Sequence, residues 1–109
     1  MITINVNDEI VKVDTWEDIV QRPFYRGDLD PGKHELGSII GRYLFGEKVR
    51  CGLSNCHTPH GRGFLVKTKD GLETNIGKDC GSTYFGVDFD DQSRQFERDL
   101  AERDGRELL

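Results

Sequence analysis

The chain has no long apolar run, and nothing in it approaches the roughly 18 consecutive apolar residues that a membrane-spanning helix needs. Its first residues also lack the basic segment followed by an apolar stretch that marks a secretory signal peptide. We therefore expect no membrane association and a cytoplasmic location. In that compartment thiols stay reduced, and clustered cysteines bind metals more often than they form disulfides.

The sequence also lacks the excess of basic residues that is typical of nucleic-acid-binding domains, whose pI usually exceeds about 9. Its net charge is −5 and its pI is about 5.1. The charge is unevenly distributed: residues 1–41 carry −4, residues 42–80 carry +3 and residues 81–109 carry −4. The acidic ends are expected to weaken nonspecific binding to phosphate groups.

Signatures of several enzyme classes are absent. The His-x-Glu and Pro-Cys-x-x-Cys pattern of zinc deaminases does not occur. Between Gly71 and Asp79, the glycines are one residue too far apart for a phosphate-binding loop, and Asp79 replaces the required Ser or Thr. We therefore expect no catalytic activity. Two alternatives stay open: a three-cysteine zinc site with Glu73 or Asp79 as a base, and a metal-free Cys56 nucleophile with His60 as its base.

The 109 residues suffice for one domain with a modest core. Charged residues make up 32% of the chain, against about 25% in an average domain. Glycine is abundant, at 13 residues, and each glycine adds chain entropy that folding must overcome. A structural metal ion would offset part of this cost, because zinc contributes on the order of 10 kcal/mol to the folding of small zinc domains.

All three cysteines lie within residues 51–80. Cys51 and Cys56 flank a tight loop that continues to His60, and Cys80 follows a predicted β-hairpin. Thiolate and imidazole groups are the usual ligands of tetrahedral structural zinc, and an odd cysteine count does not suit a disulfide framework. The sequence therefore predicts a structural Zn²⁺ held by Cys51, Cys56, His60 and Cys80.

Two histidines compete for the fourth ligand position. The side chains of adjacent residues in an extended chain point in opposite directions, so Cys56 and His57 are poorly placed to bind the same ion. His60 can loop back past Pro59, and we therefore favour His60 over His57. Two other interpretations stay open: buried cysteines beside a surface histidine, and a disulfide between Cys51 and Cys56.

A β-hairpin would bring the two halves of this site together. Two apolar segments flank Asp70-Gly71, a dipeptide that favours two-residue hairpin loops. Such a loop would pair Leu65 with Ile76. It would also return Cys80 to the neighbourhood of His60.

The chain resembles treble-clef and zinc-ribbon zinc fingers in the pattern Cys51-Gly-Leu, Cys56, His60, a hairpin and then Gly77-x-x-Cys80-Gly81. More narrowly, it is similar to bacterial and phage proteins that carry a Thr-Asn-Ile-Gly-x-x-Cys-Gly segment, here followed by Phe85-Gly86. The resemblance covers about residues 39–90 and implies a zinc-supported interaction module. The chain departs from common zinc fingers because four residues separate Cys51 from Cys56. In addition, the last element offers one thiol instead of two.

The remaining patterns predict a small α+β fold in a single domain, residues 1–109. Residues 1–35 should form a hairpin and a short helix that opens with a capping box at Thr15. Residues 36–88 should hold a strand from Leu36 to Phe45 and the zinc-supported central hairpin.

Residues 89–109 are predicted to form an exposed C-terminal helix, preceded by a short helical turn that ends at Gly86. The apolar residues of this helix form a narrow stripe, and most other positions are charged. Such a stripe can dock on another protein, so we expect a protein partner that binds helix 90–109. The stripe consists of Phe89, Phe96 and Leu100.

The predicted function is that of a structural zinc-binding module that mediates protein–protein contacts and is not itself catalytic. The alternative is a nucleic-acid-binding zinc finger, because basic residues between positions 42 and 78 are interleaved with Tyr43, Phe45 and Phe64. The competing interpretation is a solvated sheet face, with the aromatic rings buried beneath the stems of the basic side chains. The candidate nucleic-acid-binding residues are Arg42, Lys48, Arg50, Arg62, Lys67 and Lys78.

Overall fold

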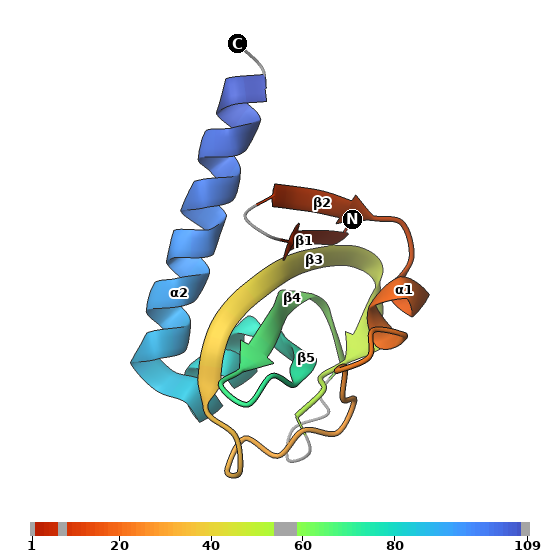
Figure 1. Ribbon diagram of the computed structural model, residues 1–109, viewed down its shortest axis with the longest axis vertical. Helices are drawn as coiled ribbons and strands as arrows, with labels where there is room; N and C mark the ends of the chain where they lie inside the picture. Colours follow the sequence, from red (N-terminus) through yellow and green to blue (C-terminus); the bar gives the residue numbers. More distant parts are fainter. Residues whose placement is uncertain (1, 7–8, 54–58, 108–109) are drawn as a thin grey trace.

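The computed structural model describes residues 2–6, 9–53 and 59–107. These residues form a five-stranded antiparallel sheet in the order β2-β1-β3-β4-β5, together with two helices (Figure 1). The predicted α+β fold is therefore confirmed. Within this part of the chain, no helix combines the length and the apolar composition needed to cross a bilayer. The elements are β1 (Ile2–Val6), β2 (Glu9–Val13), α1 (Trp16–Val20), β3 (Leu36–Arg50), β4 (Pro59–Thr68), β5 (Glu73–Gly77) and α2 (Lys78–Glu107).

The N-terminal elements form as their local patterns predict. β1 pairs with β2 on one side and with β3 on the other. Thr15 caps α1, because its hydroxyl accepts a hydrogen bond from the backbone N–H of Asp18 at 3.4 Å. The helix ends at Val20, shortly before Pro23, which disfavours helical geometry in the residue that precedes it.

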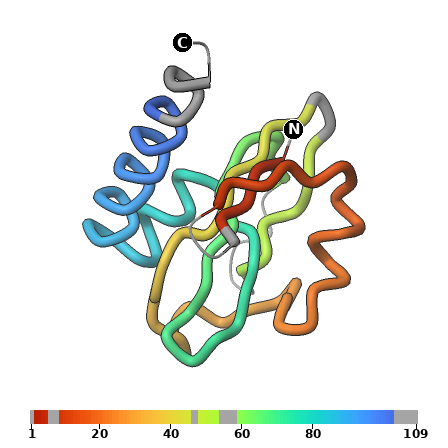
Figure 2. The backbone as a smooth tube through the Cα atoms, turned by 45° about the horizontal axis from the view of Figure 1, so that its top comes forward, coloured from red at the N-terminus to blue at the C-terminus, as the bar shows by residue number. Residues whose placement is uncertain are grey.

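β3 is a long strand that bends along its length, as Figures 1 and 2 show. Its register against β4 shifts at three points, and β-bulges of this kind bend a strand and increase its twist. Gly41 lets β1 approach closely, because a Cβ atom there would lie 2.6 Å from the backbone oxygen of Thr3. The shifts lie between Leu36 and Ser38, between Ile39 and Gly41, and between Leu44 and Val49.

The β4–β5 hairpin forms, but the predicted register is wrong by one residue. Leu65 was predicted to pair with Ile76, and it pairs with Asn75. The N–H of Gly71 donates to the carbonyl of Thr68 at 3.0 Å, and the N–H of Thr68 donates to the carbonyl of Leu72 at 2.8 Å. Three residues therefore connect the strands instead of two. Gly71 has a φ of 93° and supplies the left-handed residue of such a loop. The hydroxyl of Thr68 also accepts from the N–H of Leu72 at 3.0 Å, which stabilises the wider turn.

The sheet separates two apolar clusters. Successive residues of β4 alternate between them: Phe64 and Val66 pack with residues of α2, whereas Leu65 packs with Ile19 of α1. The middle of β4 is thus buried on both faces, which explains why Phe64-Leu65-Val66 is a continuous apolar run instead of an alternating one.

α2 covers one face of the sheet and kinks at Gly86, where φ is 68° and ψ is −143° (Figure 1). The predicted end of a helical turn at Gly86 is therefore confirmed. The apolar stripe is buried against the chain's own sheet, since Phe89, Phe96 and Leu100 are 0%, 8% and 6% exposed. A partner that binds this helix would consequently meet its charged side.

The segment after α1 covers the outer edge of β5. The N–H of Glu73 donates to the carbonyl of Phe24 at 2.9 Å, and the N–H of Arg26 donates to the carbonyl of Glu73 at 2.7 Å. The guanidinium of Arg22 donates to both carboxylate oxygens of the buried Glu73, at 2.6 and 3.2 Å. This ion pair raises the pKa of Arg22, chiefly through the hydrogen bond. These contacts hold β5 and the residues that follow it in place.

Candidate functional site

The structure places His60 and Cys80 at one pocket of about 180 Å³. His60 belongs to β4, and Cys80 lies in the first turn of α2, directly after β5. The hairpin therefore returns Cys80 to the neighbourhood of His60 as predicted, despite the shifted register. The other residues that line the pocket are Arg62, Gly77, Lys78 and Asp79.

Tyr43 fixes the ring of His60. The hydroxyl of Tyr43 is hydrogen-bonded to Nε2 of His60, and the two ring centroids lie 5.6 Å apart. Gly77 packs against the ring, since a Cβ atom there would lie 3.3 Å from Nδ1 and 3.4 Å from both Cε1 and Cγ. When Nε2 carries the proton and donates to Tyr43, Nδ1 is the nitrogen that can bind a metal ion.

Tyr43 belongs to a buried polar network centred on Asn75. The side-chain nitrogen of Asn75 donates to the Tyr43 hydroxyl at 3.3 Å and to the Arg50 carbonyl at 2.7 Å. Its side-chain oxygen accepts from the Tyr25 hydroxyl at 2.5 Å. In the described part of the chain, no buried side-chain nitrogen or oxygen lacks a hydrogen-bond partner. Because a satisfied buried network is rigid, it holds Tyr43 in one position against His60.

Cys51 follows β3 and lies next to Asn75 of this network. It is 0% exposed, and its Sγ donates to the backbone oxygen of Asn75 at 3.9 Å. Gly52 allows this close packing, since a Cβ atom there would lie 1.9 Å from Oγ1 of Thr74. Cys51 retains its thiol, so the alternative of a disulfide between Cys51 and Cys56 is wrong.

Only some of the predicted zinc ligands are placed by the structure. Cys56 and His57 lie outside the described residues. Cys80 is disulfide-bonded. Among residues 2–6, 9–53 and 59–107, no three His, Cys, Asp or Glu side chains form a group that could hold a metal ion. The four-ligand zinc site therefore stays a prediction, of which the shared pocket of His60 and Cys80 is the part that the structure describes.

The basic residues proposed for nucleic-acid binding do not form one surface with exposed aromatic rings. The guanidinium groups of Arg42 and Arg62 lie 3.8 and 3.6 Å from the carboxylate of Glu97 on α2. Lys78 lines the pocket of His60, whereas Lys48, Arg50 and Lys67 are exposed. Tyr43 and Phe64 are buried, and Phe45 packs edge-on against Trp16, so these rings stabilise the core.

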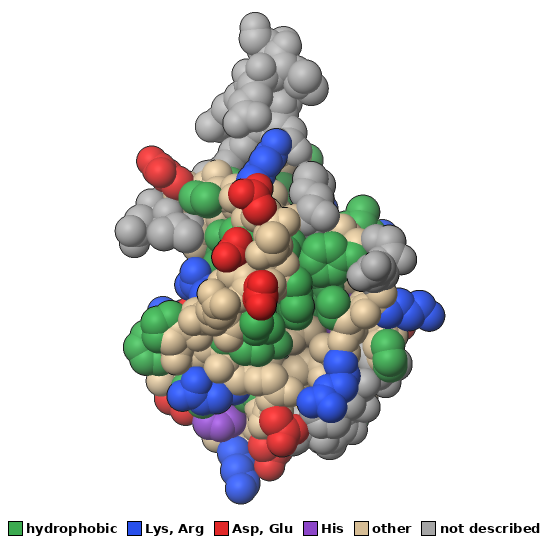
Figure 3. Space-filling model, turned by 90° about the vertical axis from the view of Figure 1, so that its right-hand side faces the viewer, with side chains coloured by type: hydrophobic (Ala, Val, Ile, Leu, Met, Phe, Trp, Pro, Cys, Tyr) green, Lys and Arg blue, Asp and Glu red, His purple; other side chains and the backbone are tan. Residues whose placement is uncertain are grey.

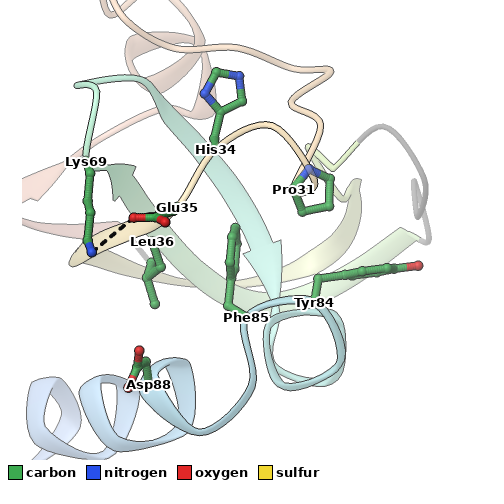
Figure 4. A pocket seen from close by; sticks show the side chains of 8 residues that line it. All are labelled: Pro31, His34, Glu35, Leu36, Lys69, Tyr84, Phe85 and Asp88. Atoms are coloured by element: carbon green, nitrogen blue, oxygen red, sulfur yellow. Dashed lines mark ion pairs between the residues drawn. The ribbon is translucent and has the colours of Figure 1, made fainter.

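A second pocket, of about 340 Å³, lies between the loop before β3, the tip of the hairpin and the kink of α2 (Figure 4). At its rim, Nζ of Lys69 lies 3.1 Å from the carboxylate of Glu35. Nδ1 of His34 lies 2.8 Å from the carboxylate of Asp70. A hydrogen bond from Thr68, followed by the one from His34, lowers the pKa of Asp70. None of the residues predicted from the sequence as zinc ligands lines this second pocket, and we assign the candidate site to the pocket of His60.

Burial raises the pKa of Tyr25 to about 12, and the neighbouring Cys51 adds to the shift. Burial also raises the pKa of Tyr43, against the opposing effect of the hydrogen bond from Asn75. An unfolded chain releases these protons near pH 10, its ordinary tyrosine value, whereas the folded chain still holds them. The free energy of unfolding should therefore fall as the pH rises above about 10. Urea unfolding at several alkaline pH values tests this. A Tyr25→Phe variant should show a smaller fall, and an equal fall in both proteins would contradict the assignment.

No protein-family model matches the chain, and the comparisons with curated proteins and with solved structures also found no match. The resemblance to zinc fingers therefore rests on the sequence motifs alone and stays a prediction. Sequence reasoning missed Asn75 and the hydroxyl of Tyr25 as supports of the site. One signal could have indicated Asn75: a polar amide inside a short strand, next to Ile76, needs hydrogen-bond partners once that strand is buried.

Proposed function

We propose that the chain is a structural zinc-binding module that presents a surface for protein contacts and is not catalytic. The observation that carries this proposal is that Tyr43 holds His60 in a pocket that also contains Cys80. Metal sites orient an imidazole ligand in this way, through a hydrogen bond to its second nitrogen. Cys51 and Cys56 would complete a set of four ligands, which leaves no position for a reactive water.

Replacing a ligand should remove the metal. Protein purified under reducing conditions should bind one zinc ion, and the His60→Ala and Cys80→Ser variants should not retain stoichiometric zinc. His34→Ala is the matched control, because His34 pairs with Asp70 outside this pocket and its loss should leave zinc binding unchanged. Competition with a colorimetric chelator measures the affinity. Equal zinc affinity in the His60 and Cys80 variants would contradict the proposed site.

Removing the hydroxyl of Tyr43 should weaken the site without removing a ligand. Loss of a hydrogen bond to a metal-binding histidine typically lowers metal affinity by about 10- to 100-fold. We expect a loss in this range for Tyr43→Phe. Tyr25→Phe is the control, because it removes another hydroxyl of the same network, one that bonds Asn75. Equal affinities in both variants would show that Tyr43 does not orient His60 toward the metal.

Exposed apolar side chains on the side of the molecule that carries α1 support a role in protein contacts. Val11 of β2, Val20 of α1 and Phe24 of the next segment are 42%, 40% and 56% exposed. Figure 3 views this side and shows apolar side chains gathered between charged ones. Clustered apolar surface is typical of sites that bind other proteins. We therefore propose this side for the protein contact, because Phe89, Phe96 and Leu100 of α2 are buried.

The nucleic-acid alternative has less support, since Arg42 and Arg62 lie beside Glu97 and the nearby Tyr43 and Phe64 rings are buried. We expect no salt-dependent binding of the zinc-loaded protein to DNA or RNA oligonucleotides in fluorescence anisotropy. Binding that weakens steeply with salt, and that is lost in the Arg50→Ala and Arg62→Ala variants, would favour the alternative.

A further inference from the structure

The larger of the two pockets described above lies beside the kink of α2, and we call it the kink pocket. Its volume is about 340 Å³, within the range of about 300–1,000 Å³ that is typical of sites for small ligands. Such sites combine apolar and aromatic walls with a few polar groups. The kink pocket has this composition, since its apolar walls are Pro31, Leu36, Tyr84 and Phe85 (Figure 4).

Two consecutive aromatic residues supply one wall of the kink pocket. Tyr84 and Phe85 end the first helical segment of α2, directly before the kink at Gly86. Phe85 packs against the apolar core, which holds its ring in place, whereas Tyr84 is 37% exposed. The face of an aromatic ring carries negative charge density and attracts a cation that lies within about 6 Å of its centre. This wall therefore suits a ligand that is both apolar and positively charged.

The charged groups of the kink pocket leave one carboxylate without a partner. The positive charge of Lys69 is matched by Glu35, whose carboxylate lies 3.1 Å away. Any positive charge on His34 is matched by Asp70, at 2.8 Å. Within the described part of the chain, the carboxylate of Asp88 takes part in no hydrogen bond or ion pair. Figure 4 shows that Asp88 points from α2 toward the pocket, which therefore presents an excess of negative charge to a ligand.

We propose that the kink pocket binds an alkylammonium ion, which is an apolar stem that ends in a positively charged amine. The stem packs against Leu36 and Pro31. The ammonium group pairs with Asp88 beside the rings of Tyr84 and Phe85. This chemistry occurs in a lysine side chain of another protein and in free alkylamines such as polyamines. The inference does not depend on the proposed zinc site, because none of the predicted zinc ligands lines the kink pocket.

Nuclear magnetic resonance of the full-length chain at pH 7 tests the class of ligand. The probe is n-butylammonium, and 1-butanol is its control, because it has the same stem and no charge. We expect saturable shifts of the backbone amide signals of Leu36, Phe85 and Asp88 with n-butylammonium. Binding of 1-butanol should be at least about fivefold weaker, because it loses both the ion pair and the attraction to the rings. Equal affinities for the two probes would overturn the proposal.

Two carboxylate variants test the role of the unpaired charge. Asp88→Asn should weaken the binding of n-butylammonium by about two- to fivefold. Asp91→Asn is the matched control, because it removes the same charge from the same helix, but Asp91 pairs with Arg94 and does not line the kink pocket. Both aspartates are exposed, and the same spectra report whether each variant keeps its fold. Equal affinities in the two variants would overturn the proposal.

Two variants of Tyr84 test the aromatic wall. Tyr84→Leu keeps an apolar side chain but removes the ring, so we expect binding of n-butylammonium about two- to fivefold weaker. Tyr84→Phe keeps the ring and should bind as tightly as the wild-type chain. Equal affinities in these two variants would contradict the proposed attraction between the ring and the ammonium group.

A second pair of probes distinguishes the two sources of the ammonium group. Nα-acetyl-lysine-N-methylamide represents a lysine within a protein, and N-acetyl-1,4-diaminobutane represents a free alkylamine with the same single charge. Tighter binding of the lysine probe assigns the site to another protein, and tighter binding of the diamine assigns it to a free alkylamine. Either result supports an alkylammonium site. The absence of binding by both would overturn the proposal.

Discussion

Removing zinc under reducing conditions should unfold most of the protein. Metal binding in small zinc domains contributes on the order of 10 kcal/mol to folding, which is comparable to the roughly 5–15 kcal/mol of total stability of a typical domain. The pocket of His60 and Cys80 joins β4 to the start of α2, so its loss should loosen the attachment of α2 to the sheet. Thermal unfolding with and without a strong zinc chelator measures the effect.

The disulfide-bonded form of the protein is the control for this experiment. Its disulfide at Cys80 supplies a cross-link that needs no metal, so the chelator should leave its melting temperature unchanged. If the chelator also left the melting temperature of the reduced protein unchanged, the fold would not depend on a metal ion.

Adding one methyl group at Gly81 should destabilise the protein by about 2 kcal/mol. A Cβ atom there would lie 2.2 to 2.5 Å from three ring atoms of Phe89, which is fully buried beneath the sheet. Overpacking of this kind costs about 1–3 kcal/mol, and the better helix propensity of alanine returns at most about 1 kcal/mol. The free energy of unfolding of Gly81→Ala in urea measures the net loss.

Two further variants separate the steric cause from other effects. Gly27→Ala should be nearly neutral, because a Cβ atom there would make only an ordinary 3.7 Å contact with Tyr25. In a Phe89→Leu background, Gly81→Ala should cost clearly less, since the ring atoms that meet the new methyl group are gone. An additive double variant would contradict the predicted clash.

Features set by local chemistry could be predicted from the sequence. The capping residue Thr15, the N-terminal hairpin and the kink at Gly86 each depend on a few neighbouring residues, and the structure confirms all three. The strand from Leu36 was also predicted, although it continues to Arg50. In these segments, the alternation of apolar and polar residues and the turn-forming residues suffice to predict the structure, because no distant contact opposes them.

Features set by distant contacts could not be predicted. The Asp70-Gly71 dipeptide favours a two-residue loop, yet the hydrogen bonds of Thr68 select three residues and shift the register. The sequence left open whether Tyr43 lies on a basic surface or beneath the stems of basic side chains, and only the contacts of the bent sheet show that it is buried against His60. The network around Asn75 joins segments that are far apart in sequence, so no local pattern could reveal its geometry.

X-ray absorption at the zinc edge of the reduced, purified protein tests the central claim most directly. The predicted ligand set gives one zinc ion per chain with three sulfur neighbours at about 2.3 Å and one nitrogen neighbour at about 2.0–2.1 Å. The nitrogen signal should disappear in the His60→Ala variant, and the sulfur count should fall in Cys80→Ser. A protein without stoichiometric zinc, or a zinc ion surrounded only by oxygen and nitrogen, would contradict the account.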